Sequence, residues 1–323
     1  MAGGSTKVVL AALIGNGAIA ITKFIASAIT GSSAMFAEAI HSVVDTGNQG
    51  LLLYGIGRSQ KPADAAHPFG YGKEIYFWSF VVAILLFALG AGISFYEGVH
   101  KFLHPEPMTN AIWNYVVLAL AMAFEAVAWW IAYAEFNKVR GKLPILRAVR
   151  QSKDPALFTV LFEDTAAMLG LITAFIGVLL ADQFGMLWAD GAATLVIGTI
   201  LASAAIFLAI ETKGLLIGEA ADPATVDAVA AIVKKHPMTR HLGEIRSIHF
   251  GPDDVLMVLS LDAQDHLMAG EIEASVSELE RTIKENHPDI KRLFIEIQNK
   301  HDTAAAQSTD DQGNAVTNGG NIG

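Results

Sequence analysis

The sequence contains no cysteine and little charge. Of its 323 residues, 17% are charged and 53% are hydrophobic. The absence of cysteine excludes disulfides and thiolate-bound metals, so any metal must be held by His, carboxylate, amide or water ligands. The scarcity of charge in so long a chain excludes an ordinary soluble protein. The composition therefore predicts an integral membrane protein with an attached soluble part.

Patterns typical of metallohydrolases and nucleotide-binding proteins are missing as well. No HExxH pattern occurs, and the GxG patterns at Gly15 and Gly70 lack a strand-to-helix context. From Lys213 to the C-terminus, 10 Lys and Arg stand against 18 Asp and Glu. This acidic balance disfavours a nucleic-acid partner. We expect neither an enzyme nor an organic cofactor.

Six long apolar segments each contain close to the roughly 20 residues that cross a bilayer as a helix. They lie at about 8–30, 36–57, 75–96, 112–134, 155–181 and 191–210. The loops after the second and fourth segments are basic, whereas those on the other side carry only Lys101. Because cytoplasmic loops are enriched in Lys and Arg, both termini are predicted to be cytoplasmic. The opening MAGGSTK lacks signal or transit features, and we expect a bacterial cytoplasmic membrane.

The second apolar segment carries a row of polar side chains. Glu38, His41, Asp45 and Asn48 follow one another at spacings of three, four and three. These spacings place all four on one face of a helix, where His41 and Asp45 could close on one cation. Ionisable groups within a membrane are costly and usually serve a function. We predict a metal site here, with a polar seam between packed helices as the alternative.

The fifth apolar segment contains two adjacent acids, Glu163 and Asp164. Neighbouring residues point about 100° apart on a helix, so both cannot face the same centre equally. Together with the second segment they offer a mixed set of nitrogen and oxygen ligands. Such a set suits Zn²⁺, although Mn²⁺, Fe²⁺ and Co²⁺ accept similar ligands.

Two further charged residues interrupt the apolar segments. Lys23 is near enough to the end of the first segment for its ammonium to reach the membrane surface. Glu125 lies deeper in the fourth segment. There we expect a hydrogen bond to a neighbouring helix, with proton relay as the alternative.

From Asp222 onward the pattern changes to that of a small α+β domain. An amphipathic helix, two alternating strands, a second amphipathic helix and a third strand follow in the order αββαβ, which we interpret as ferredoxin-like. We therefore predict a six-helix transmembrane domain at 8–212, a cytoplasmic domain at 213–300 and a disordered tail at 301–323.

Four stretches of the chain carry a family resemblance. HSVVDTGNQ, the loop KPADAAHPFGYGKE, LFEDTAAMLG and the αββαβ region together resemble the cation diffusion facilitator family of proton-coupled metal exporters. The motifs resemble the branch that includes the animal mitochondrial zinc transporter. The resemblance implies a homodimer in the lipid membrane that exports a divalent metal, with Zn²⁺ favoured, against protons by alternating access.

The resemblance also implies ligands. His41 and Asp45 match the paired ligands of the second span, and Asp164 matches the acidic ligand of the fifth. The sequence has Val160 where many members place a His, so Asn48, Glu163 or water would complete the site. More oxygen and less nitrogen would weaken zinc preference and leave room for manganese or iron.

The loop after the second span resembles the family's peripheral metal site. Asp64 and His67 match ligands there, but Tyr71 stands where a third ligand often lies. The alternative is a loop in which His67 only forms hydrogen bonds. In the C-terminal domain the ligand positions of some relatives read Ser260, Glu271 and Glu296, so we expect dimerisation there rather than a dinuclear metal site.

Proton coupling follows from the proposed ligands. His41 must be neutral and Asp45 and Asp164 ionised to bind a cation, so metal and protons compete for the same groups. A metal-selective channel is the alternative, although no filter loop is evident.

Overall fold

The computed structural model describes residues 2–30, 33–105 and 111–299. The chain divides into two compact units between Ile217 and Gly218. The last helix of the first unit extends past the predicted boundary at residue 212 and ends at Ile217. The tail predicted to be disordered, 301–323, lies outside the described residues.

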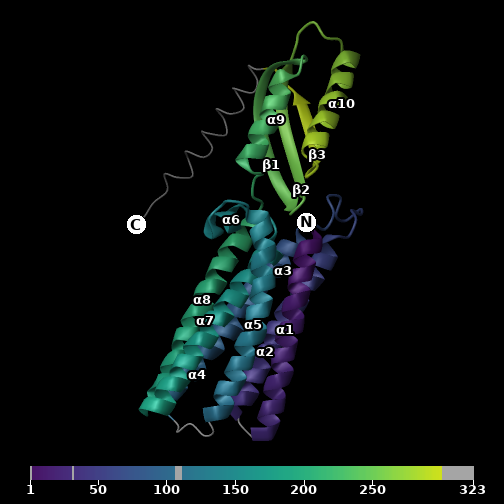
Figure 1. Cartoon of the computed structure of the whole chain (residues 1–323). Coiled ribbons are helices and arrows are strands. Elements are labelled where there is room, and N and C mark those ends of the chain that lie inside the picture. Colours follow the sequence, from purple (N-terminus) through teal and green to yellow (C-terminus); the bar gives the residue numbers. More distant parts are fainter. Residues whose placement is uncertain (1, 31–32, 106–110, 300–323) are drawn as a thin grey trace, which may run out of the picture. The chain divides into compact units, whose positions relative to one another are not determined.

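The first unit is a bundle of long helices that lie side by side (Figure 1). Its elements are α1 (Ala2–Thr30), α2 (Ser33–Ser59), α3 (Glu74–Leu85), η1 (Leu86–Ala91), α4 (Gly92–Leu103), α5 (Ala111–Arg140), α6 (Ile145–Gln151), α7 (Pro155–Phe184) and α8 (Trp188–Ile217). The segments α3, η1 and α4 follow one another without a break, and η1 is a π-helical turn within them. They therefore form the single span predicted at 75–96.

Among the described residues, five helical segments are long and apolar enough to cross a membrane. They are Ser5–Ile25, Glu74–Leu103, Ile112–Arg140, Pro155–Phe184 and Trp188–Ile217. The helix α2 does not reach this apolarity, because Asp45, Asn48 and Gln49 interrupt it. Its 27 residues would still extend about 40 Å at about 1.5 Å per residue. The membrane crossing of α2 thus stays a prediction.

The helices pack in a definite order of neighbours. The helix α2 packs on α1 and α3, α5 packs on α1 and α7, and α8 packs on α4 and α7. At Gly191 of α8 an added Cβ would lie 2.4 Å from the backbone nitrogen of Phe102 in α4. Only glycine allows the two backbones to approach this closely. Asn48 and Gln49 of α2 and Glu163 and Asp164 of α7 are buried within the bundle.

The second unit is a small α+β fold. Its elements are α9 (Pro223–Lys235), β1 (Thr239–Gly251), β2 (Asp254–Ala263), α10 (Ala269–Asn286) and β3 (Ile290–Ile297). The helix α9 begins as its Asp-Pro sequence predicts, because the Asp222 carboxylate accepts a hydrogen bond of 2.8 Å from the Ala224 amide. The α+β class and the αββαβ order are confirmed, whereas the likeness to a ferredoxin fold stays a prediction.

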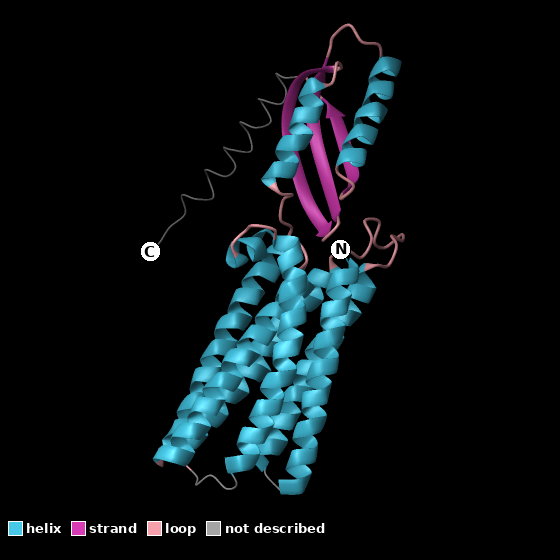
Figure 2. Ribbon diagram, viewed as in Figure 1, coloured by secondary structure: helices cyan, strands magenta, loops and turns pink. Residues whose placement is uncertain are grey.

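The sheet has the order β1-β2-β3, with β1 antiparallel and β3 parallel to β2. Both helices cover the same face of the sheet (Figure 2). The residues of β2 that point to this face alternate along the strand and are buried. The core that they share includes Val229, Val233, Val255, Met257, Leu259, Leu261, Leu279 and Ile283. The opposite face carries Phe294, which pairs in register with Val258 and is 54% exposed.

Candidate metal centre

Glu163 lies at the contact between α2 and α7. Its Oε1 accepts a hydrogen bond of 3.1 Å from the Asn48 amide, and its Oε2 accepts one of 3.2 Å from the Gln49 amide. All three side chains are buried. The structure thus brings together Asn48 and Glu163, which the sequence offered as alternative ligands.

Sequence reasoning missed Gln49. Gln49 lies beside the predicted polar row, about 100° around the helix from Asn48. The Glu163 side chain nevertheless reaches both, because each of its two oxygens takes one amide. The signal was a second amide directly after Asn48 in an otherwise apolar stretch. The Gln49 Oε1 atom is buried and has no hydrogen bond within the described part of the chain.

Asp164 has a different environment from its neighbour. It is 1% exposed, and its Oδ2 atom has no hydrogen-bond partner among the described residues. A buried carboxylate oxygen without a partner is costly and is normally compensated by a cation or a proton. The charges of Asp45, Glu125 and Glu163 also act on Asp164. Asp164 therefore has a carboxylate oxygen available to bind a cation, whereas both oxygens of Glu163 already accept hydrogen bonds.

Asp45 connects this region to the predicted polar row of α2. It is half-buried, and its charge acts on Glu125, Glu163 and Asp164. The side chains of Glu38 and His41 lie outside the described part. Among the side chains that are described, no three His, Asp or Glu residues converge on one metal position. The carboxylates are near enough to interact by charge, and whether they form one ligand set is a prediction.

The expectation that Lys23 reaches the membrane surface is wrong. Lys23 on α1 is 7% exposed, and its Nζ donates a hydrogen bond of 3.0 Å to the Ser42 hydroxyl of α2. Glu125 on α5 is 3% exposed, and the charges of Lys23 and Asp45 both act on it. The α1–α2 and α1–α5 contacts place the lysine between packed helices rather than at a free helix end.

The loop at 60–73 is organised by Asp64. Its Oδ1 accepts hydrogen bonds from the amides of Ala66 at 3.0 Å and His67 at 2.7 Å, and its Oδ2 accepts one of 2.7 Å from the Tyr71 hydroxyl. The His67 and Tyr71 rings lie 4.2 Å apart. These contacts favour a structural role for Asp64. Metal binding by Asp64 and His67 stays a prediction.

Acid should loosen this loop. The hydrogen bond from Tyr71, followed by the backbone amide of His67, lowers the pKa of Asp64 below its usual 3.8. A lowered pKa means that the ionised form holds the folded loop above that range and that this contribution is lost as the pH falls through it. We expect the protection factors of the Ala66 and His67 amides, which correct exchange for its intrinsic pH dependence, to fall in acid, and to fall at pH 7 in Asp64→Ala. Unchanged protection in both would contradict this.

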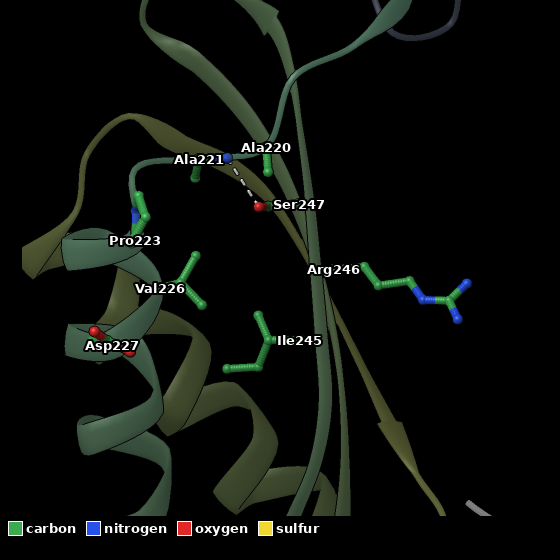
Figure 3. Close-up of a pocket in the computed structure, with 8 residues that line it drawn as sticks. All are labelled: Ala220, Ala221, Pro223, Val226, Asp227, Ile245, Arg246 and Ser247. Atoms are coloured by element: carbon green, nitrogen blue, oxygen red, sulfur yellow. Dashed lines mark hydrogen bonds between the residues drawn. The ribbon is translucent and has the colours of Figure 1, made fainter. Parts of the chain in front are cut away.

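The C-terminal unit has a pocket between the start of α9 and β1 (Figure 3). Its lining is mostly apolar, and the Ser247 hydroxyl already accepts a hydrogen bond of 3.0 Å from the Ala221 amide. Arg246 and Asp227 point away from one another, and Arg246 pairs with Glu244 at 2.6 Å. These eight lining residues thus present no converging set of ligands.

Comparison with known proteins places these residues within one domain family. The model of the cation efflux transmembrane domain matches residues 9–217. The chain belongs to the cation efflux family. This confirms the resemblance to the cation diffusion facilitators, and it assigns Asp45, Glu163 and Asp164 of this cation efflux protein to the transmembrane domain of a transporter family.

Several relatives of this cation efflux protein are named for zinc or manganese. It is 34% identical over 261 residues to the human proton-coupled zinc antiporter SLC30A9, mitochondrial, a match that covers 80% of this chain and 46% of the relative. It is 31% identical to the Xenopus laevis protein of that name, over 91% of this chain and 60% of the relative. The chain thus spans about half the length of these relatives. It is 27% identical to the manganese efflux system protein MneP of Bacillus subtilis, over 91% of this chain and 95% of the relative.

Proposed function

We propose that this protein exports a divalent metal cation in exchange for protons by alternating access. The observation that carries the proposal is Asp164, a buried carboxylate with an oxygen that no described residue satisfies, inside a cation efflux domain. Asp45 acts on it by charge. A cation held there would compensate the cost of the buried carboxylates.

The ligands that we propose are His41, Asp45 and Asp164, completed by Asn48 or Glu163. A metal binds only when His41 is neutral and the carboxylates are ionised, so metal entry releases protons and proton entry releases metal. Asn48, Gln49 and Glu163 join α2 to α7. A relative movement of these two helices would therefore change the ligand set and open the site to one side or the other.

Zn²⁺ is the cargo that we propose first, and Mn²⁺, Fe²⁺ and Co²⁺ are the alternatives. The relatives with 34% and 31% identity are named for zinc, whereas MneP is named for manganese. A set with one imidazole and several oxygens accepts both zinc and manganese.

We propose six spans, with α2 crossing the membrane beside α1 and α3. Arg58 lies in the last turn of α2 and Lys61 follows that helix. Lys138 and Arg140 lie in the last turn of α5, and Lys142 follows it. These basic loops support cytoplasmic termini. The correspondence with MneP over 95% of its length supports a bacterial cell membrane as the location.

We propose that the protein acts as a homodimer through its C-terminal unit. The sheet face opposite α9 and α10 exposes Phe294, beside the half-buried Val258. Large exposed apolar side chains on an uncovered sheet face are typical of interaction surfaces.

Phe294→Asp should dissociate this dimer, because it replaces the large exposed apolar side chain of this sheet face with a charge. Light scattering on protein purified in detergent is expected to give the monomer mass for this variant and the dimer mass for wild type. Met268→Asp is the control, since Met268 is also apolar and is 76% exposed but lies in the turn before α10. A Phe294→Asp variant that stays dimeric would exclude this face as the interface.

The exporter proposal is tested with purified protein in liposomes under an imposed pH gradient. Zinc or manganese should accumulate against its own gradient, and the internal pH should change in step. A protonophore should abolish the accumulation. Metal that only equilibrates, with no effect of the pH gradient, would favour the channel and contradict the antiporter.

A further inference from the structure

A buried ammonium lies beside the proposed metal site. Lys23 donates a hydrogen bond of 3.0 Å to the Ser42 hydroxyl. Ser42 precedes Asp45 by three residues on α2, so both lie on the same side of that helix. Glu125 of α5 feels the charges of both Lys23 and Asp45. One cation and two carboxylates from three different helices are therefore gathered here.

The lysine needs these carboxylates. An ammonium with only a hydroxyl partner is strongly disfavoured inside a membrane, and intramembrane Lys residues are normally paired with acids. Lys23, Glu125 and Ser42 are each less than 9% exposed, so water does not supply the compensation. The charge of Glu125, which interacts with that of Lys23, supplies it.

The lysine and the amide-bound carboxylate flank the proposed site. Ser42 and Asn48 are six residues apart on α2, which corresponds to about 9 Å along the helix axis. Lys23 is bonded at the first and Glu163 at the second, with Asp45 between them. A metal bound by Asp45 would thus have the ammonium of Lys23 as a neighbour, on the side of the site nearer the N-terminal end of α2.

We propose that Lys23 is a tethered counter-cation of the transport site. Its ammonium neutralises Asp45 and Glu125 while metal is absent, and it repels the metal once this is bound. The lysine thereby weakens equilibrium binding and speeds release. This role rests on the proposed exporter function. Lys23 acts through the carboxylates and is a positioning residue rather than a ligand.

Three variants test this assignment by zinc titration calorimetry and by pH-driven zinc uptake into liposomes. Lys23→Met removes the positive charge, so the Kd for zinc should fall about tenfold and kcat should fall about tenfold. Glu125→Gln leaves the ammonium in excess, so zinc binding should weaken about tenfold. The double variant removes both charges, and its Kd should return to within about threefold of wild type.

Two controls separate charge from structure. Lys23→Arg keeps the charge and should bind zinc like wild type. Lys7→Met removes a charge from the same helix at an exposed position and should change neither Kd nor kcat. A merely structural role for Lys23 would lower kcat without tightening zinc binding.

The outcomes for the two proposals differ. If wild type moves no metal, the exporter function itself fails. If wild type exports zinc and folded Lys23→Met binds zinc as wild type does or more weakly, only the counter-cation role fails. If Lys23→Met does not fold, the comparison of Glu125→Gln with the double variant still tests the counter-cation role. A double variant that binds zinc as weakly as Glu125→Gln would overturn that role.

Discussion

Asp164→Asn should reduce metal-for-proton exchange by about a hundredfold or more, since even residues that only support metal ligands contribute about 10–100-fold. The substitution keeps the size of the side chain but removes its charge and its ability to carry a proton. Asp164 is buried with an unsatisfied Oδ2 atom, so the loss of charge should leave the fold intact. The measurement is pH-driven zinc and manganese uptake into liposomes.

The control for this variant lies on the same helix. Asp182 is exposed on α7, where its carboxylate accepts a hydrogen bond of 3.2 Å from the Tyr115 hydroxyl. Asp182→Asn should transport at the wild-type rate. If Asp164→Asn also transported at that rate, the buried acids of α7 would be packing residues.

Glu163 offers a sharper comparison, because two substitutions should separate its structural and electrostatic roles. Glu163→Ala leaves the buried amides of Asn48 and Gln49 without their acceptors. Each unsatisfied buried donor costs about 1–3 kcal/mol. Glu163→Ala should therefore lower the thermal stability of the protein in detergent and abolish transport.

Glu163→Gln should preserve stability and still impair transport. The new amide oxygen can accept from Asn48, and the new amide nitrogen can donate to Gln49 Oε1, which lacks a partner among the described residues. Stability should stay within about 1 kcal/mol of wild type, because both hydrogen bonds between α2 and α7 can be kept once the Gln49 amide turns over. Transport should fall about tenfold or more through the lost charge.

The two results together test whether transport needs the charge of Glu163 and whether stability needs its hydrogen bonds. Wild-type transport by Glu163→Gln would contradict a role for the Glu163 charge and would leave Asn48 or water to complete the site. Equal stability of the Ala and Gln variants would contradict the hydrogen-bonded bridge between α2 and α7.

Much of the fold follows from local pattern. The length of the apolar segments predicted the five helices that qualify as spans. The alternation of apolar and polar residues in the strands, together with the Asp-Pro start of α9, predicted the αββαβ order. The crossing of α2 is less evident because the polar residues that suggest a site also lower its apolarity. A functional helix is for this reason harder to identify as a span than a purely structural one.

The site itself was only partly predictable. Helical spacing placed Asp45 and Asn48 on one face, but it does not tell how far a side chain reaches. The two oxygens of Glu163 therefore hold Gln49 as well as Asn48, although Gln49 lies off the predicted row. The direction of Lys23 depends on α2 and α5, distant in sequence, so a single helix could not reveal that it points inward.

The most direct test of the metal site is anomalous diffraction from crystals of the full chain grown with zinc. We predict a zinc peak between α2 and α7, about 2.0–2.2 Å from a carboxylate oxygen of Asp164, with Asp45 among its neighbours. A peak confined to the loop that carries Asp64 and His67, with none among the membrane helices, would contradict the account.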